Sequence, residues 1–473
     1  MGGRAGHRHR GGRLSDLIIR GGTVITTGGR RTADVAVNGG RIVAVEDQLP
    51  TSAELREVDA RGMLVLPGVI DVHTHTRVAS DDEPDRFYQD SVAAAFGGTT
   101  TFLAFNNPGT GSPRTHSLID DIRGWRAATD SDAAVDYGVS LVVTPEEQEA
   151  LGEIPAAIDA GVPTFKAFMV YDFGVSDATL SKVLGLASRH GGMLEVHCED
   201  RDALESRTAE LLDAGKIEPR YHADSRPDFV EAAGTDKAIR LARAAGAPLH
   251  VVHLSCGEAL DVVRAARAAD QPVFAETCPH YLALDESRYD LPPEEACKYV
   301  ISPPLRPVSN CSALWGGLAD GSLVLVATDH VPDRFAKEKQ TYRESFDKIS
   351  NGGPGIETLL TIVFSEGVAK GRITIERMVD LLSTTPARLF GLNAKGSIEV
   401  GKDADIVIFD PAERRTVSAA ELHHTSDYTP YEGMAVTGGV VSTLLRGEFV
   451  VRDGHFVGRR GYGRFQERRL AWR

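Results

Sequence analysis

Apolar runs alternate with amphipathic stretches through the middle of the chain. We expect eight of the runs to be buried strands of a parallel sheet, because their residues are hydrophobic on both faces. These runs are 63–72, 99–105, 135–143, 164–169, 193–198, 249–254, 272–277 and 323–328. Between several of them the apolar residues have helical spacing, and one predicted helix begins after Ser176, a good N-cap, and ends at Gly191.

Repeated strand–helix units predict an α/β fold, a (β/α)8 barrel of the TIM type. A doubly wound open sheet is the competing architecture. The sequence has no glycine-rich phosphate loop after a strand, which such a sheet often carries. The barrel is therefore the favoured prediction.

Both ends of the chain have a different pattern of apolar residues. Residues 16–62 and 393–460 contain short β-branched runs separated by glycines, a pattern typical of strands joined by tight turns. The simplest packing joins both segments in one small β-sandwich. We therefore divide the chain into a disordered extension (1–15), a composite sandwich (16–62 and 393–460), the barrel (63–392) and a C-terminal tail (461–473). The tail either docks on a neighbouring subunit or is loose.

Composition and charge narrow the class of protein. The formal net charge of −15 argues against a nucleic-acid partner. No apolar run is long enough for a transmembrane helix, so we expect no membrane association. The five cysteines are odd in number and form no CxxC pair, which argues against a disulfide framework or a zinc–thiolate site. A reducing cytoplasm fits best.

Metal-competent side chains stand at or near the C-terminal ends of the predicted barrel strands. That end of a TIM-type barrel carries the active site in nearly all such enzymes. Side chains alternate along a strand, so the two histidines that close the first strand face the same way and can reach one ion. Neutral imidazoles and carboxylates suit zinc, with manganese or cobalt as alternatives. The candidate ligands are His73, His75, Lys166, His197, His253 and Asp329.

Lys166 is the least ordinary of these residues. A lysine between apolar neighbours in a barrel strand is costly unless it is paired or chemically changed. Burial lowers a lysine pKa, and the neutral amine can react with CO₂. The product, N6-carboxylysine, is an anion whose two oxygens can bridge two ions. His73, His75 and Asp329 would then hold one ion, and His197 and His253 the other.

Other histidines receive a structural interpretation. His250 lies on the opposite strand face from His253, and we expect it to be a hydrogen-bonded core residue. His222 and His424 lie in segments that look exposed, so we assign them no role.

Several stretches together resemble the dihydropyrimidinase/hydantoinase family of cyclic amidohydrolases, over about residues 16–465. Any one of these stretches alone would be a weak signal, but their combination is highly specific. They are PGVIDVHTH at 67–75, KAFMVY at 166–171, VHCED at 196–200, ETCPHY at 276–281, SPPLR at 302–306, ATDH at 327–330 and NGGPGIE at 351–357.

This resemblance implies a barrel with a composite β-sandwich, two zinc ions bridged by carboxylated Lys166, and a homotetramer. It implies hydrolysis of the ring amide of hydantoins or dihydropyrimidines to N-carbamoyl amino acids, by attack of a metal-bridging hydroxide. Asp329 would also be the proton shuttle, and Tyr171 would stabilise the oxyanion. The backbones of Ser302 and Asn351 would hold the ring of a small cyclic amide or imide.

Some residues depart from the hydantoinase pattern. His280 stands where allantoinases and dihydroorotases often have histidine, and Cys198 also occurs in allantoinase-like sequences. The resemblance therefore leaves allantoinase as the nearest alternative. Tyr171, Ser302 and Asn351 argue against it.

Two further alternatives remain. A non-catalytic dihydropyrimidinase-like scaffold protein would lack metal ligands, whereas this sequence has all six. A mononuclear deaminase with the same barrel would not need Lys166.

Overall fold

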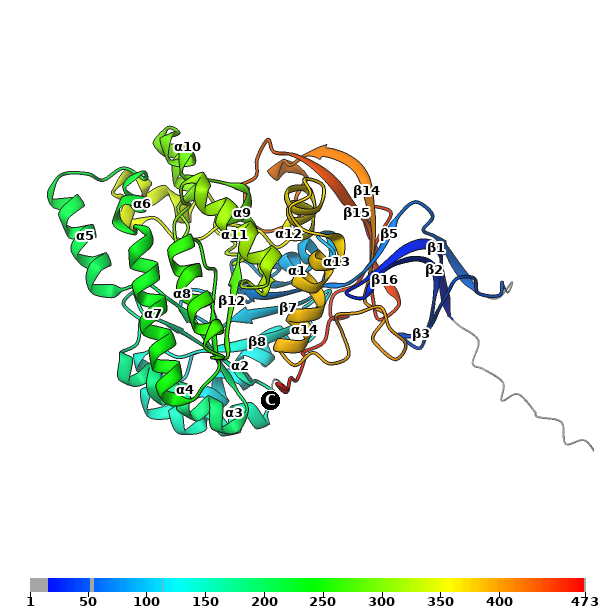
Figure 1. The fold of residues 1–473 in the computed structure, drawn as a ribbon, viewed down its shortest axis with the longest axis horizontal. Coiled ribbons are helices and arrows are strands. Elements are labelled where there is room, and N and C mark those ends of the chain that lie inside the picture. The colour runs from blue at the N-terminus through cyan, green and yellow to red at the C-terminus, as the bar shows by residue number, and fades with distance from the viewer. Residues whose placement is uncertain (1–15, 52–54, 113, 472–473) are drawn as a thin grey trace, which may run out of the picture.

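The computed structural model describes residues 16–51, 55–112 and 114–471, so the extension predicted at 1–15 lies outside the described residues. A parallel barrel surrounded by helices makes up the larger part, and a second sheet lies beside it (Figure 1). The predicted TIM-type fold is confirmed.

The barrel strands follow one another around the ring in chain order. Within the described ranges there are eight: β6 (Val69–Thr74), β7 (Thr99–Phe105), β8 (Asp136–Val142), β9 (Thr164–Phe168), β10 (Met193–His197), β11 (Leu249–Val251), β12 (Val273–Thr277) and β13 (Leu325–Val326). A parallel bridge between Thr74 and His330 joins the first strand to the segment after the last. The Asp71 carboxylate strengthens this closure, since it accepts hydrogen bonds from the Thr328 backbone N–H (3.1 Å) and hydroxyl (2.5 Å).

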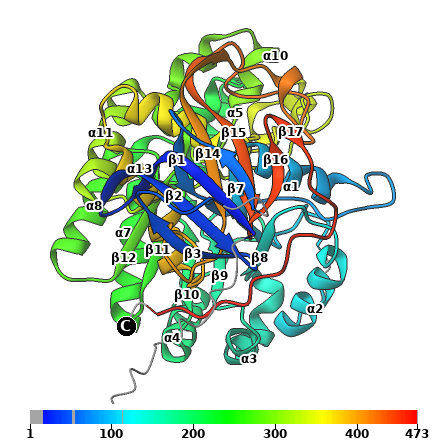
Figure 2. The same ribbon diagram turned by 90° about the vertical axis from the view of Figure 1, so that its right-hand side faces the viewer.

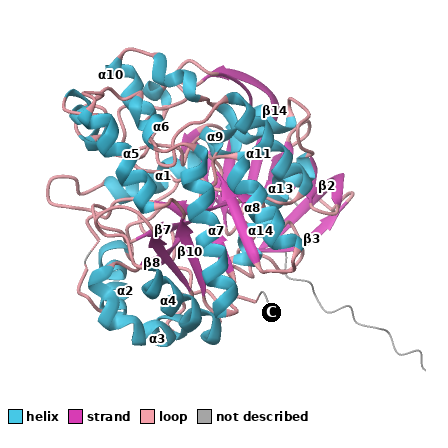
Figure 3. Ribbon diagram, turned by 60° about the vertical axis from the view of Figure 1, so that its left-hand side comes forward, coloured by secondary structure: helices cyan, strands magenta, loops and turns pink. Residues whose placement is uncertain are grey.

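Helices cover the outside of the barrel (Figure 3). The helix predicted after Ser176 is confirmed as α4 (Asp177–His190): the Ser176 hydroxyl accepts from the Thr179 backbone N–H, and Gly191 ends the helix with a φ of 86°. Left-handed backbone at that position favours glycine. The other helices are α1 (Arg86–Phe96), α2 (Leu118–Thr129), α3 (Ile154–Asp159), α5 (Arg201–Asp213), α6 (Tyr221–Ser225), α7 (Asp228–Ala245), α8 (Gly257–Ala268), α9 (Pro279–Ala283), α10 (Pro293–Ala296), α11 (Val308–Asp320), α12 (Leu359–Val363), α13 (Ile375–Val379) and α14 (Thr385–Leu389).

Both ends of the chain build the second sheet, as predicted. It encloses an apolar core of its own that includes Ile19, Val35 and Ile406. In the described part of the chain it has nine strands: β1 (Leu17–Thr26), β2 (Gly29–Asn38), β3 (Arg41–Glu46), β4 (Arg56–Asp59), β5 (Leu64–Pro67), β14 (Ile406–Thr416), β15 (Ala435–Leu445), β16 (Glu448–Arg452) and β17 (His455–Phe456).

The apolar run at 63–72, predicted as one strand, is two strands in different sheets. β5 pairs with β1 and β14, whereas β6 opens the barrel. The chain changes sheet at Gly68, whose N–H donates to the Asp405 carbonyl (2.8 Å). A Cβ at Gly68 would lie 2.1 Å from the Thr100 hydroxyl oxygen. Since both sheets bury this run, hydrophobicity alone could not show the break.

The C-terminal tail packs on its own barrel, so the alternative that it is loose is wrong, whereas contact with a neighbouring subunit stays a prediction. Figure 2 shows it in red, running past the barrel strands. Phe465 forms a parallel bridge with Tyr137. Arg468 is buried and donates to the Val139 carbonyl (2.5 Å) and the Thr164 hydroxyl (2.8 Å). Among the described residues, no helix has the length and apolar character needed to cross a bilayer.

Candidate metal centre

The predicted ligands meet at one end of the barrel lumen. The Nε2 atoms of His73 and His75 lie 3.0 and 3.1 Å from the same oxygen, Asp329 Oδ1. Ligand atoms of His73, His253 and Asp329 lie within 4.8 Å of one another. The His197 ring is next to them, with its centroid 4.6 Å from that of His253. Residues from strands far apart in the sequence therefore form one cluster of donors.

Lys166 lies in the lumen among apolar side chains. Its Nζ is 4.5 Å from the centroid of the Phe105 ring and 5.0 Å from that of Phe168. The side chain is fully buried, and its Nζ has no hydrogen-bond partner in the described part of the chain. Burial lowers its pKa. An amine without a partner beside imidazoles and a carboxylate fits a carboxylated lysine that helps to hold divalent ions.

The protonation states suit metal binding. Burial lowers the pKa of His75, His197 and His253, which favours the neutral imidazole that a metal needs. Burial alone would raise the pKa of Asp329, but the nearby His73 and His75 hold it well below its ordinary value. These three imidazoles are therefore neutral and Asp329 is ionised. His73 differs: burial and Lys166 lower its pKa, but Asp329 and Glu276 outweigh them and raise it to about 9, so a metal ion would have to displace its proton.

Buried acids and an amide orient the histidines. Glu276 pairs through Oε1 with His73 Nδ1, and its Oε2 lies 2.9 Å from Nε2 of His250, which is buried as predicted. Glu199 Oε2 lies 2.7 Å from His197 Nε2. Similarly, Asn107 Oδ1 lies 2.7 Å from His75 Nδ1. Such partners fix the tautomer and the direction of a ligating ring.

The orienting role of these residues was not predicted from the sequence. Glu276 and Glu199 both lie in stretches that carry the family resemblance; Glu276 is the penultimate residue of β12, and Glu199 follows β10 by two residues. A glutamate at the end of a buried strand could have indicated this role, because a buried acid needs a hydrogen-bond or ion-pair partner.

Tyr171, His253 and Asp329 have left-handed backbone, with φ values of 71°, 39° and 51°. Such positions cost about 1–3 kcal/mol each and cluster at functional sites. The predicted strand ends were wrong here: β11 stops at Val251 and β13 at Val326, so His253 and Asp329 lie in the turns that follow. These turns change the direction of the His253 and Asp329 side chains, which the alternation of side chains along a strand could not predict.

A cavity of about 260 Å³ opens in front of the cluster. All three residues predicted to contact substrate, Tyr171, Ser302 and Asn351, line it together with His75, His197, His253 and Asp329. Burial raises the pKa of Tyr171, so its hydroxyl stays protonated and can donate a hydrogen bond. The pocket has room for a small ring.

Residues 64–450 match the Amidohydrolase family. The chain belongs to the amidohydrolase family. It is 42% identical over 458 residues to a D-hydantoinase from Geobacillus stearothermophilus, covering 95% of this chain and 96% of the relative.

Two solved structures have the same fold as this amidohydrolase. One is a D-hydantoinase from a Bacillus species (TM-score 0.92, 43% identity, 97% of this chain and 100% of that one). The other is a dihydropyrimidinase from Brevibacillus agri (TM-score 0.91, 41% identity, 97% and 99%). The predicted family resemblance is confirmed.

His222 of this amidohydrolase was expected on the surface, and that prediction is wrong. The residue is buried on α6, with its Nε2 2.9 Å from the Ile301 carbonyl and 3.4 Å from the Ser302 hydroxyl. The short polar helix gave no apolar pattern that would indicate burial. His222 instead supports the segment that brings Ser302 to the cavity.

Proposed function

We propose that this amidohydrolase hydrolyses the ring amide of hydantoins or dihydropyrimidines and releases N-carbamoyl amino acids. The observation that carries the proposal is the buried, unpaired amine of Lys166, for which no described residue offers a hydrogen bond, beside convergent ligands at a ring-sized cavity. Relatives that are named D-hydantoinase and dihydropyrimidinase support this substrate class over the allantoinase alternative.

Two divalent ions, zinc first with manganese or cobalt as alternatives, complete the site in this proposal. Lys166 is carboxylated: its Nζ forms a bond to the carbon of CO₂ and loses one proton, which leaves an anion with two oxygens. When bound, the ions supply an activated water and polarise the substrate carbonyl. The residues that would hold them are His73, His75, Lys166, His197, His253 and Asp329.

The chain's own residues orient the ring and move the proton. The backbones of Ser302 and Asn351 bind the ring amide groups and present one carbonyl. The Tyr171 hydroxyl donates a hydrogen bond to that carbonyl oxygen as negative charge develops on it. Asp329 accepts a proton from the attacking water and returns it to the ring nitrogen as the C–N bond breaks.

The deciding experiment compares initial rates of the zinc-loaded, bicarbonate-supplied protein on dihydrouracil, hydantoin, 5-phenylhydantoin and allantoin. We expect the N-carbamoyl acid from the first three and little product from allantoin. Preference for allantoin would replace this proposal with the allantoinase alternative. Two bound zinc ions with no turnover of any of the four would refute the substrate class.

Tyr171→Phe tests the oxyanion role. Loss of one preorganised donor should lower kcat about 10²-fold or more. Zinc content should not change, because Tyr171 is not in the ligand set. An unchanged kcat would remove Tyr171 from the mechanism.

We also propose a cytoplasmic homotetramer. Five free cysteines among the described residues are consistent with a reducing compartment. The tetramer rests on the family resemblance alone. Light scattering of the purified protein gives its mass directly, and the mass of a monomer or dimer would refute it.

A further inference from the structure

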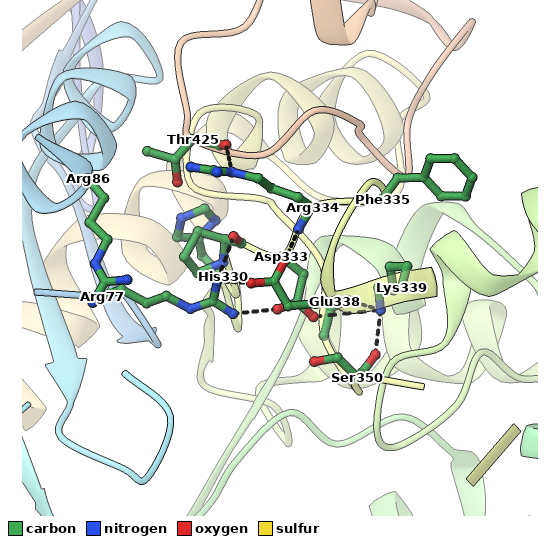
Figure 4. Close-up of polar contacts among 12 residues, drawn as sticks. Arg77, Arg86, His330, Asp333, Arg334, Phe335, Glu338, Lys339, Ser350 and Thr425 are labelled. Atoms are coloured by element: carbon green, nitrogen blue, oxygen red, sulfur yellow. Dashed lines mark hydrogen bonds and ion pairs between the residues drawn. The ribbon is translucent and has the colours of Figure 1, made fainter. Parts of the chain in front are cut away.

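A second fully buried lysine lies beside the pocket. Lys339 belongs to the short helix η4 (Glu338–Arg343) in the segment that follows Asp329. Its Nζ donates to the backbone carbonyls of Val300 (2.9 Å), Ser350 (2.6 Å) and Gly352 (2.6 Å). Figure 4 shows this ammonium and its bond to Ser350. A lysine has three donors, so all of them are used on backbone.

These carbonyls belong to the two segments that carry the proposed ring-binding residues. Val300 stands two residues before Ser302, and Ser350 and Gly352 flank Asn351. Ser302 and Asn351 both line the cavity. The Lys339 ammonium therefore links the segment that carries Ser302 to the segment that carries Asn351.

The segment that carries Lys339 is itself anchored near the metal cluster. Arg77, which follows the first barrel strand and lines the cavity, donates to Asp333 Oδ1 (2.6 Å) and Glu338 Oε1 (2.8 Å) (Figure 4). Two further bonds brace the Asn351 side: the Tyr428 hydroxyl donates to the Gly352 carbonyl (3.2 Å), and the Val331 N–H to the Gly353 carbonyl (3.0 Å).

We propose that Lys339 is a positioning residue that sets the spacing between the Ser302 and Asn351 backbones and thereby the fit of the substrate ring. This role rests on the proposed function, because the ring is what those backbones bind. Lys339 does not line the cavity, so it acts through the two segments. A misplacement of about 1 Å in such a frame can cost about 10²-fold in rate or affinity.

The surroundings keep Lys339 charged at neutral pH. Burial lowers its pKa to about 8, and the groups that oppose this effect are Asp333, Cys297 and Glu338. Asp333 Oδ2 is 3.9 Å from the ammonium. A protonated Lys339 can serve all three carbonyls, whereas a neutral amine has one donor fewer.

Lys339→Met tests the proposal, with Lys337→Met as the matched control because Lys337 is exposed two residues away. In Lys339→Met we expect KM for dihydrouracil to rise about tenfold or more. We expect kcat to change by less than about threefold, since the Ser302 and Asn351 backbones bind the ring equally in the ground state and the transition state. Zinc content should equal that of the wild type. The Lys337→Met control should match the wild type in KM, kcat and zinc content.

A merely structural role would lower kcat and zinc content together with thermal stability. That pattern, or an unchanged KM in a folded, zinc-loaded Lys339→Met protein, would overturn the proposal. Tyr428→Phe provides a milder second variant. It removes one hydrogen bond to the Gly352 carbonyl and should raise KM by less than Lys339→Met does.

Hydrogen exchange separates failure of this proposal from failure of the proposed function. Amide protection of peptides that span 300–304 and 349–354 should fall together in Lys339→Met and not in Lys337→Met, whatever the substrate is. If the wild type is inactive on every ring but both peptides lose protection, the substrate class is wrong and the positioning role stands. If protection is unchanged, the positioning role is wrong.

Discussion

Lys166 and Lys395 are both buried lysines, but one lies in the barrel lumen and the other where the barrel meets the second sheet. The Lys395 ammonium is 2.7 Å from an Asp136 oxygen and 2.5 Å from an Asp405 oxygen. For Lys166 Nζ, the described residues provide no hydrogen bond. Their pKa values shift in opposite directions: burial lowers that of Lys166, whereas Asp405 and Asp136 outweigh burial and raise that of Lys395.

The difference distinguishes a buried lysine that stabilises the fold from one that takes part in the chemistry of the site. A charge taken out of water is tolerated when ionised partners surround it, as at Lys395. A buried lysine without a partner in the fold is tolerated only if another group, such as a bound ion or a covalent modification, interacts with its amine. The partners of Lys395 therefore explain its burial, whereas the burial of Lys166 is explained by the carboxylation and metal binding that we propose.

Lys166→Met sharpens the comparison with the largest expected effect. Methionine keeps much of the volume but cannot be carboxylated, so kcat should fall on the order of 10³-fold or more. Metal analysis should show less bound zinc than in the wild type. In the metal-free protein, the free energy of unfolding should not fall, because a buried amine without a hydrogen-bond partner is removed from the lumen. Retained turnover with methionine at position 166 would contradict the proposed carboxylation.

Lys395→Met should have the opposite consequences. It leaves the Asp136 and Asp405 carboxylates buried with less positive charge, although Arg446 still pairs with Asp136. The free energy of unfolding should drop by about 3–5 kcal/mol in denaturant titrations. Activity per folded molecule and zinc content should equal those of the wild type. A loss of kcat without a loss of stability would show that the two lysines are not separable in this way.

The sequence predicted the barrel and the cluster well because both follow from simple patterns. Apolar runs identify buried strands, and His73, His75, Lys166 and His197 stand on or at the ends of such runs. The barrel geometry then brings their C-terminal ends together.

The rest of the site depends on contacts that sequence patterns do not encode. The positive φ of His253 and Asp329 arises in turns whose conformation the whole barrel imposes. Lys339 donates to backbone carbonyls, and a carbonyl has no residue type that could signal it. The break at Gly68 is invisible to hydrophobicity, since two different sheets bury the residues on either side.

A pH titration of stability gives the smallest expected effect and compares Lys395 with Lys339. Burial lowers the pKa of Lys339 to about 8 from an ordinary value of 10.5. Between these pH values the unfolded chain binds more protons at this residue than the native protein does. The free energy of unfolding of the wild type, relative to Lys339→Met, should therefore rise by up to about 1.4 kcal/mol per pH unit in that window.

Lys395 should behave differently, because its pKa is raised in the folded protein. Its contribution is fully present below the ordinary lysine pKa and is lost only as the pH rises through the higher folded value. The difference in unfolding free energy between the wild type and Lys395→Met should therefore stay flat from pH 8 to 10 in urea titrations, while the Lys339→Met difference grows. Two parallel curves would mean that three backbone carbonyls hold the proton on Lys339 as firmly as carboxylates hold it on Lys395.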